Sequence, residues 1–198
     1  MKNISIRFAT PKDASSLLSI YAPYVRKTSI TYEYEVPSMA EFERRIRHVT
    51  KSYPYLVAES DGELLGYAYA DRFHERQAYD WSVETTLYIR EDCRNMGLGK
   101  LLYDTLEKIL KVQNIVNVNA CIAYPPTEDE YLTQNSVNFH RHMGYHLVGE
   151  FKKSGYKFGR WYSTVWMDKQ IGIHQDVQPP FLPIDEVREF INKEYGIM

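Results

Sequence analysis

One stretch constrains the fold of this chain more than any other, because it joins a strand to a helix through a glycine-containing turn. Residues 83–89 are typical of a strand, and residues 100–110 place leucine and isoleucine at helical spacing. Gly97 and Gly99 lie between them. Glycine lets the backbone pass close to a bulky ligand, and the first N–H groups of a helix favour an anion. The stretch therefore predicts a phosphate-binding turn.

The spacing of these glycines excludes two common phosphate-binding motifs. A Rossmann dinucleotide motif needs a third glycine where this chain has Leu102, and no glycine here is followed at P-loop spacing by Gly-Lys-Ser/Thr. What remains is Arg-x-x-Gly-x-Gly after a strand, beginning at Arg94. This motif alone is equally typical of an ordinary tight turn before a helix, so the surrounding residues must distinguish the two interpretations.

The composition indicates one globular domain: the chain has 198 residues, of which 44% are hydrophobic and 25% charged. A net charge of −2 suggests no nucleic-acid or membrane partner. Cys93 and Cys121 are too few for a disulfide framework, and the N-terminal residues lead into a strand-like run rather than a signal peptide. No apolar run approaches the ~18 residues of a membrane span. We therefore expect a cytoplasmic protein.

Periodicity predicts strands that alternate with helices along most of the chain. Helices are expected after the cap at Thr10, from Ser38 to about Val49, over residues 100–110, and from Asn135 to Gly144. The predicted strands are residues 4–8, 55–59, 64–69, 80–89, 115–122, 145–151 and 161–167. Loops are expected at residues 24–37, 72–79 and 155–159.

The order of these elements predicts a mixed α/β sheet. Hairpins imply antiparallel pairs, and the strand–helix–strand crossover through the glycine turn implies one parallel pair. Residues 1–170 are expected to form the domain. Residues 171–198 are polar and proline-rich before a short helix near residues 184–195, and we expect them to form a C-terminal tail that packs on the domain or on a partner.

The order of elements over residues 4–168 resembles that of the GCN5-related N-acetyltransferases (GNAT). Four sequence blocks are similar to the phosphinothricin acetyltransferase subfamily of these enzymes. The blocks are YPYLVAE at residues 53–59, AYDWSVETTLY at 78–88, SVNFH at 136–140 followed by GY at 144–145, and GYKFGRW at 155–161. Their length and spacing make this resemblance far more specific than the glycine motif alone.

The resemblance implies a GNAT fold, a mostly antiparallel sheet flanked by helices with splayed central strands. It also implies an N-acetyltransferase that uses acetyl-CoA and no metal, acts by direct attack in a ternary complex, and forms a homodimer. The acceptors would be the α-amino groups of small amino acids and analogues such as phosphinothricin, methionine sulfoximine and methionine sulfone. The loop at residues 124–134 is longer and more acidic than in many members, which leaves the natural acceptor open.

Acetyl transfer needs a base for the ammonium group of the acceptor and a proton for the departing thiolate. By resemblance Glu84 matches the family's glutamate base, although strand alternation alone would equally let it face solvent or an arginine. His140 lies where many members place a tyrosine beside the sulfur of CoA; a surface histidine is the alternative. His140 and His142 do not share a helix face, so they are not a convincing metal pair. Cys121 as a covalent nucleophile is disfavoured, because nothing beside it in sequence lowers its pKa.

The resemblance also assigns contacts to both substrates. Leu87, Tyr88 and Ile89 would follow the pantetheine arm, and Asn135 would bind pantetheine or cap a helix. The pyrophosphate would be wrapped by Arg94, Asn95, Met96, Gly97, Leu98, Gly99 and Lys100, the last of which could equally be a solvated helix charge. The acceptor would be bound by Arg76 at its carboxylate, by Tyr32 and Tyr79 as aromatic walls, and by Glu84. Lys157 and Arg160 fall in a late hairpin that the subfamily places near the partner's site.

Two other functions fit the sequence less well. One is an acetyltransferase for another small amine, including an antibiotic. The other is a module that senses acyl-CoA without turnover, and the presence of both Glu84 and His140 argues against it.

Overall fold

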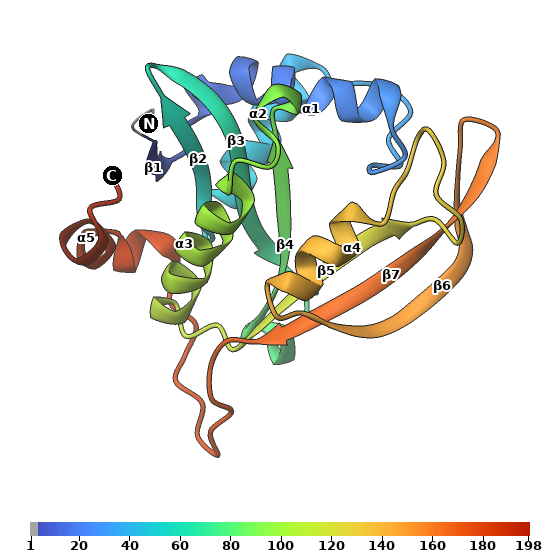
Figure 1. Cartoon of the computed structure of the whole chain (residues 1–198). Coiled ribbons are helices and arrows are strands. Elements are labelled where there is room, and N and C mark those ends of the chain that lie inside the picture. The colour runs from blue at the N-terminus through green and yellow to red at the C-terminus, as the bar shows by residue number, and fades with distance from the viewer. Residues whose placement is uncertain (1–3) are drawn as a thin grey trace.

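The computed structural model describes residues 4–198 and contains a seven-stranded sheet with helices on both faces (Figure 1). The strand order is β1-β2-β3-β4-β5-β7-β6. Only β4 and β5 pair in parallel, and the other neighbours are antiparallel, as the sequence predicts. The strands are β1 (Ser5–Phe8), β2 (Tyr55–Ser60), β3 (Glu63–Arg72), β4 (Ser82–Ile89), β5 (Asn117–Tyr124), β6 (His146–Lys157) and β7 (Arg160–Gln170).

The helices divide between the two faces of the sheet. On one face, α1 (Ala14–Lys27) and α2 (Met39–Val49) cover aromatic side chains of β3 and β4, such as Tyr67 and Tyr88. On the other face lie α3 (Leu98–Val112), α4 (Asn135–His142) and α5 (Ile184–Tyr195), with α5 beside α3 (Figure 1). Successive residues of a strand point to opposite faces, so β4 presents Glu84 to the first face and Thr85 to the second.

The two central strands part soon after they meet. β4 and β5 pair only over Ser82–Glu84 and Asn117–Asn119, after which β5 continues to pair with β7. Beyond Glu84 the backbone groups of β4 on that side have no strand partner. The expected splay is therefore present, and Glu84 stands at its apex (Figure 1).

Several predicted boundaries were wrong because burial outweighs local signals. The helix α1 continues past Pro23 to Lys27, into the expected loop, because it buries Tyr24 and Val25 in the core. Burying two such side chains offsets the roughly 3 kcal/mol cost of an interior proline. The strand β6 runs to Lys157 through the expected turn region, with register shifts that absorb its extra residues.

Residues 171–198 pack on the domain. Ile184, Ile191 and Ile197 are buried in the main core, and the backbone N–H of Phe8 donates to the carbonyl of Met198 at 2.9 Å. The buried side chain of Gln113 donates to the carbonyl of Leu182 at 2.8 Å. The tail therefore completes the core beside α3. Over the part of the chain that the structure describes, no helix is long and apolar enough to cross a membrane.

We predict that Ile191→Ala lowers the free energy of unfolding by about 2–4 kcal/mol, because it leaves a cavity at a fully buried site. Urea denaturation followed by circular dichroism measures this change. The neighbouring substitution Phe190→Ala is the control, since Phe190 is 51% exposed and its loss should cost under about 1 kcal/mol. Equal effects of both substitutions would mean that α5 does not belong to the core.

Candidate active site

The N-terminus of α3 offers unpaired backbone donors next to the end of β4. Gly97 caps the helix with a φ of +79°, and no side chain caps the free N–H groups that follow. The first turn contains no acidic residue. The guanidinium of Arg94 lies 5.0 Å from the ring centre of Tyr24. These features together favour an anion at this end of α3.

The other residues of the glycine turn have separate roles. A Cβ on Gly99 would lie 3.1 Å from atoms of Leu87 and Phe139, so the small size of Gly99 lets α3 pack against β4 and α4. The side chain of Leu98 is buried in the core, and Lys100 forms an exposed ion pair with Asp104 at 2.6 Å. The expectation that both glycines make room for a ligand therefore needs correction, because packing fills the space beside Gly99. Asn95 and Met96 are exposed at the turn.

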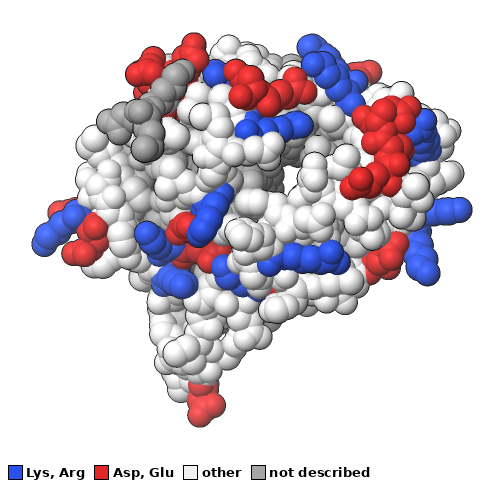
Figure 2. All heavy atoms as spheres, in the orientation of Figure 1, with Lys and Arg blue, Asp and Glu red and all other residues white. Residues whose placement is uncertain are grey.

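A cavity of about 280 Å³ occupies the split between β4 and β5, and the surface is hollowed there (Figure 2). Figure 2 also shows acidic and basic side chains interspersed on this side of the molecule, without one dominant charge. We call this cavity the cleft. It is lined by Ile30, Thr31, Tyr32, Tyr69, Glu84, Thr85, Thr86, Leu87, Tyr88, Tyr103, Ala120, Cys121, Ile122, Ala123, Ser136, His140 and Thr164. Neighbouring residues of β4 face opposite sides of the sheet, so side chains from either side can reach a ligand in the cleft.

The carboxylate of Glu84 is held in a setting that favours its neutral form. Burial raises the pKa of Glu84, and the negative charge of Asp71 adds to this effect. Asp71 is the direct partner of Glu84 across β3 and β4. The cleft also brings Glu84 near Cys121, whose thiol is accessible through the opening but largely surrounded by protein. Burial raises the pKa of the Cys121 thiol to about 11, with a smaller contribution from the charge of Glu84.

His140 is a buried histidine held by hydrogen bonds on both ring nitrogens. Nδ1 lies 2.7 Å from the carbonyl of Ser136, so Nδ1 carries the proton and donates it. Nε2 is then an acceptor for the hydroxyl of Tyr103 at 3.1 Å. Burial lowers the pKa of His140 to about 4. The imidazole is therefore neutral near pH 7, and its free lone pair is directed at Tyr103.

The loop between α1 and α2 spans the mouth of the cleft and ties its two sides together. The hydroxyl of Tyr32 donates to the carbonyl of Ser163 on β7 at 2.9 Å, and the ring of Tyr32 lies against Gly155. The ammonium of Lys157, which is buried, donates to the carbonyl of Thr31 at 2.7 Å. Tyr32 thus forms one wall of the cleft, and Lys157 is engaged within its own chain.

The acidic loop after β5 is held by its own chain. Arg160 contacts Asp129 at 2.9 Å and Glu130 at 2.7 Å, and the ring of Tyr131 stacks on Phe158. The N–H of Ser29 also donates to the carbonyl of Tyr131 at 3.0 Å. The loop therefore fixes the α1–α2 segment from the far side, while one arginine offsets only part of the charge of its three carboxylates.

The predicted pyrophosphate residues 94–100 do not line the cleft, and four further predicted site residues also lie outside it. Arg76 and Tyr79 lie in the exposed segment before β4, where the Tyr79 ring packs against Phe73. The backbone N–H and carbonyl of Ile89 are both engaged by the hydroxyl of Tyr24. Asn135 is exposed at the start of α4 and is not its cap, because Gln134 occupies that position.

Sequence reasoning missed cleft residues that come from distant elements. Tyr103 lies on the buried side of α3, where its helical spacing with the leucines indicated only a core residue. Tyr69 lies on β3 and Thr85 on β4, and no local pattern distinguishes them from core residues. Among residues 4–198, no group of three His, Cys, Asp or Glu side chains gathers as metal ligands would.

Comparison with known proteins gives consistent matches over most of the chain. A family model described as an acetyltransferase (GNAT) domain matches residues 6–166. The phosphinothricin N-acetyltransferase of Streptomyces viridochromogenes is 30% identical over 176 residues, 89% of this chain and 92% of that protein. The L-methionine sulfoximine/L-methionine sulfone acetyltransferase of Pseudomonas aeruginosa is 31% identical over 168 residues, 82% of this chain and 92% of that protein. A phosphinothricin acetyltransferase structure from Sinorhizobium meliloti, in complex with AcCoA, has a TM-score of 0.80 at 32% identity and covers 89% of this chain and 92% of that one.

The buried neutral His140 predicts a pH dependence of stability. Its pKa is about 4 in the folded protein against 6.5 as the ordinary value, so the unfolded chain binds a proton that the folded chain excludes. The contribution of His140 to the free energy of unfolding is therefore highest above pH 6.5, where His140 is neutral in both states, and it decreases as the pH falls from 6.5 towards 4. Between pH 7.5 and 5 the loss should be about 2 kcal/mol.

Urea unfolding at both pH values measures this loss. His140→Gln should remove about that much of the pH dependence, whereas the exposed His142→Gln on the same helix should keep it. If the stability of His140→Gln depends on pH as the wild type does, His140 is protonated in the folded state.

Proposed function

Because the chain belongs to the GNAT acetyltransferase family and is an acetyl-CoA-dependent N-acetyltransferase, we propose that it acetylates the α-amino group of a small amino acid or analogue. The observation that carries this proposal is Glu84, a half-buried carboxylate at the apex of a cleft that both sheet faces can reach. The relatives named for phosphinothricin and for methionine sulfoximine and sulfone support the choice of acceptor class.

Acetyl-CoA fits the cleft from the side of α3 and α4. We propose that its pyrophosphate lies at the backbone N–H groups after Gly97, with Arg94 beside it. The pantetheine arm would then extend along Leu87 and Tyr88, where β4 lacks a strand partner. This arrangement would bring the thioester to the apex of the split, next to Glu84.

In the proposed reaction, Glu84 takes a proton from the ammonium group of the acceptor. The free amine then attacks the thioester carbonyl and the new C–N bond forms. The attached nitrogen loses its second proton as the C–S bond breaks, and that proton neutralises the departing thiolate of CoA. A carboxylate with a raised pKa is a stronger base than an ordinary one, and proton transfer improves as the pKa of the base approaches the working pH. The raised pKa of the Cys121 thiol disfavours a covalent route through that residue.

The hydrogen bond to the departing thiolate is assigned to the second side of the cleft. We propose that the neutral His140 positions Tyr103 through the hydrogen bond from its hydroxyl to Nε2, and that the hydroxyl turns its one hydrogen from Nε2 to the sulfur as the thiolate departs. The sequence placed His140 itself beside the sulfur of CoA. The hydrogen bond of Nδ1–H to Ser136 leaves the imidazole no proton to donate at Nε2, which is why we assign His140 the positioning role.

The acceptor would approach from the other face. The segment before β4 lies on this face, because Phe73 packs against both Tyr79 and Trp166, and Trp166 is the register partner of Cys121. We therefore keep Arg76 as the proposed partner of the acceptor carboxylate and Tyr79 as part of an outer wall, with Tyr32 as the inner wall.

We predict that Glu84→Gln lowers kcat/KM for the acceptor by ~10²–10⁴-fold, because the amide cannot accept the ammonium proton. Thiol release from acetyl-CoA, measured over a panel with L-phosphinothricin and L-methionine sulfone, tests this. The wild-type kcat/KM should rise as the pH rises through the raised pKa of Glu84. Cys121→Ala is the control, and it should retain turnover if the amine attacks directly. Full activity of Glu84→Gln would exclude Glu84 as the base.

We also propose that the protein forms a homodimer through the free edge at β6. Large apolar side chains are exposed on β6, with Val148 at 63% and Phe151 at 62%, and on the neighbouring β7, with Trp161 at 57%. Such a surface is typical of an interface rather than of a solvated edge. We place the protein in the cytoplasm, a reducing compartment suited to the free thiols of Cys93 and Cys121.

Sedimentation velocity tests the dimer. We expect a dimer for the wild type and a monomer for Phe151→Asp, because a carboxylate at the apolar edge would lose its hydration on association. Phe190→Asp changes an exposed phenylalanine on α5 in the same way and should remain dimeric. A monomeric wild type would refute the proposed interface.

A further inference from the structure

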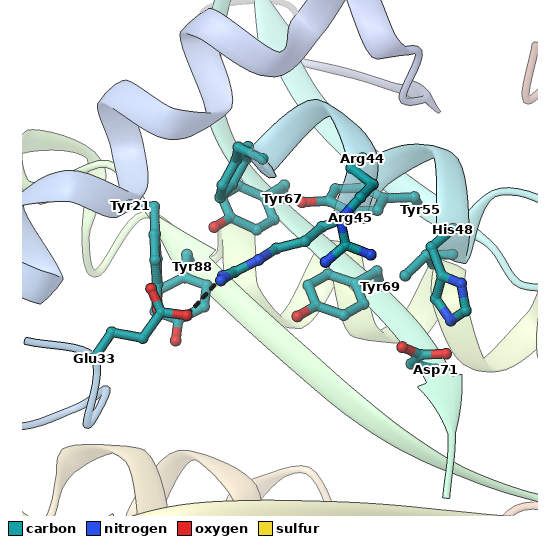
Figure 3. Close-up of a pocket in the computed structure, with 12 residues that line it drawn as sticks. Tyr21, Glu33, Arg44, Arg45, His48, Tyr55, Tyr67, Tyr69, Asp71 and Tyr88 are labelled. Atoms are coloured by element: carbon teal, nitrogen blue, oxygen red, sulfur yellow. Dashed lines mark hydrogen bonds and ion pairs between the residues drawn. The ribbon is translucent and has the colours of Figure 1, made fainter. Parts of the chain in front are cut away.

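A second cavity of about 270 Å³ lies beside the cleft, between α1, α2 and the sheet (Figure 3). We call it the tyrosine chamber. The chamber and the cleft share Tyr69 and Tyr88 as walls. Arg44 and His48 are exposed at its rim, so it is open to solvent. Its lining consists of Tyr21, Glu33, Phe42, Arg44, Arg45, His48, Val49, Tyr55, Tyr67, Tyr69, Asp71 and Tyr88.

Two tyrosine hydroxyls of this chamber have no partner within the described chain. The side chains of Tyr55 and Tyr67 are only 3% and 1% exposed, but both line the chamber, and neither hydroxyl bonds to another group among residues 4–198. Figure 3 shows the rings of Tyr55, Tyr67 and Tyr69 grouped about the side chain of Arg45. Neither hydroxyl is among the fully enclosed polar atoms that lack a partner, so each can bond to water or to a polar ligand atom in the chamber.

The charges around the chamber favour an uncharged ligand group. The guanidinium of Arg45 is bonded to Glu33 at 2.6 Å and to Glu41 at 2.9 Å, and Arg44 is bonded to Glu41 at 2.8 Å. Both arginines are thus already neutralised by carboxylates. The end of the chamber nearest the cleft carries Asp71, whose negative charge would repel an anion.

The shape of the chamber suits a chain that ends in a polar group. The rings of Tyr55, Tyr67 and Tyr69 stack with centroid distances of 5.6 Å and 4.7 Å from Tyr55, which gives a flat apolar wall. Asp71, at one end, is the register partner of Glu84, and Tyr67 lies four residues back along β3. At the rise of a strand this spans about 13 Å. An acceptor with its amine at Glu84 can therefore extend its side chain into the chamber.

We propose that the tyrosine chamber is the subsite for the acceptor's side chain, and that it takes an uncharged side chain ending in hydrogen-bond acceptor oxygens, such as a sulfone. This inference rests on the proposed function. The phenol hydroxyls of Tyr55 and Tyr67 donate to these oxygens, and the stacked rings contact the methylene stem. An acceptor with a neutral sulfone is then preferred over one with an anionic phosphinate.

The test compares L-methionine sulfone with L-norleucine, an amino acid of similar length that lacks the oxygens. Isothermal titration in the presence of CoA gives the Kd of each for the wild type and for Tyr67→Phe. One hydrogen bond contributes about 1–1.5 kcal/mol, so Tyr67→Phe should weaken binding of the sulfone about 5–12-fold and leave norleucine unchanged. In turnover the KM for the sulfone should rise by the same factor, while kcat and the KM for acetyl-CoA stay within twofold.

Tyr53→Phe is the matched control, because Tyr53 is also a buried tyrosine whose hydroxyl lacks a partner, and it lines neither cavity. It should bind the sulfone as the wild type does. If Tyr67→Phe weakens the binding of both ligands equally, or of neither, the chamber is not a side-chain subsite. A kcat/KM for L-phosphinothricin higher than that for the sulfone would also overturn this proposal. A wild type that binds acetyl-CoA but neither binds nor acetylates any amino acid would instead refute the proposed function.

Discussion

The parting of β4 and β5 is the constraint on which the rest of the structure depends. Backbone groups that lose their strand partner must find others, and this sheet leaves them facing a cavity instead. The short ladder ending at Glu84 and Asn119 fixes where the split begins. It thereby places one carboxylate at the point where ligands from the two faces of the sheet can meet.

An open split must be held apart by contacts elsewhere. On the side of α3, Gly99 lets Leu87 and Phe139 pack against the helix, so the helix at whose N-terminus we propose an anion site also fixes α4 and His140. On the other side, Tyr32 and Lys157 tie the α1–α2 loop to the hairpin of β6 and β7. The contacts of Tyr32 and Lys157 are hydrogen bonds, and the bond from the buried ammonium of Lys157 is costly to break. The cleft is therefore largely formed before a ligand binds.

In the proposed function, the cleft and the tyrosine chamber combine chemistry and selection on one sheet face. Burial raises the pKa of Glu84, the charge of Asp71 on the neighbouring strand adds to this effect, and the same carboxylate of Asp71 sets the charge at the entrance to the chamber. A substitution at Asp71 would thus change the base and the side-chain preference together. The arginines of α2 contribute little free charge, because Glu33 and Glu41 already neutralise them.

Periodicity and motif spacing are local properties, so they were enough to predict the order of strands and helices and the parallel crossover at the glycine turn. The candidate base Glu84 came from the resemblance to a known family. Local signals failed at Pro23 and in β6, where burial and pairing with distant residues outweigh them. Only the tertiary structure decided which residues share a site. Tyr103 contacts His140, and Tyr67 and Arg45 line one cavity, through packing of elements far apart in the chain. The protonation of His140 depends on burial by those same elements, and no sequence pattern records burial of that kind.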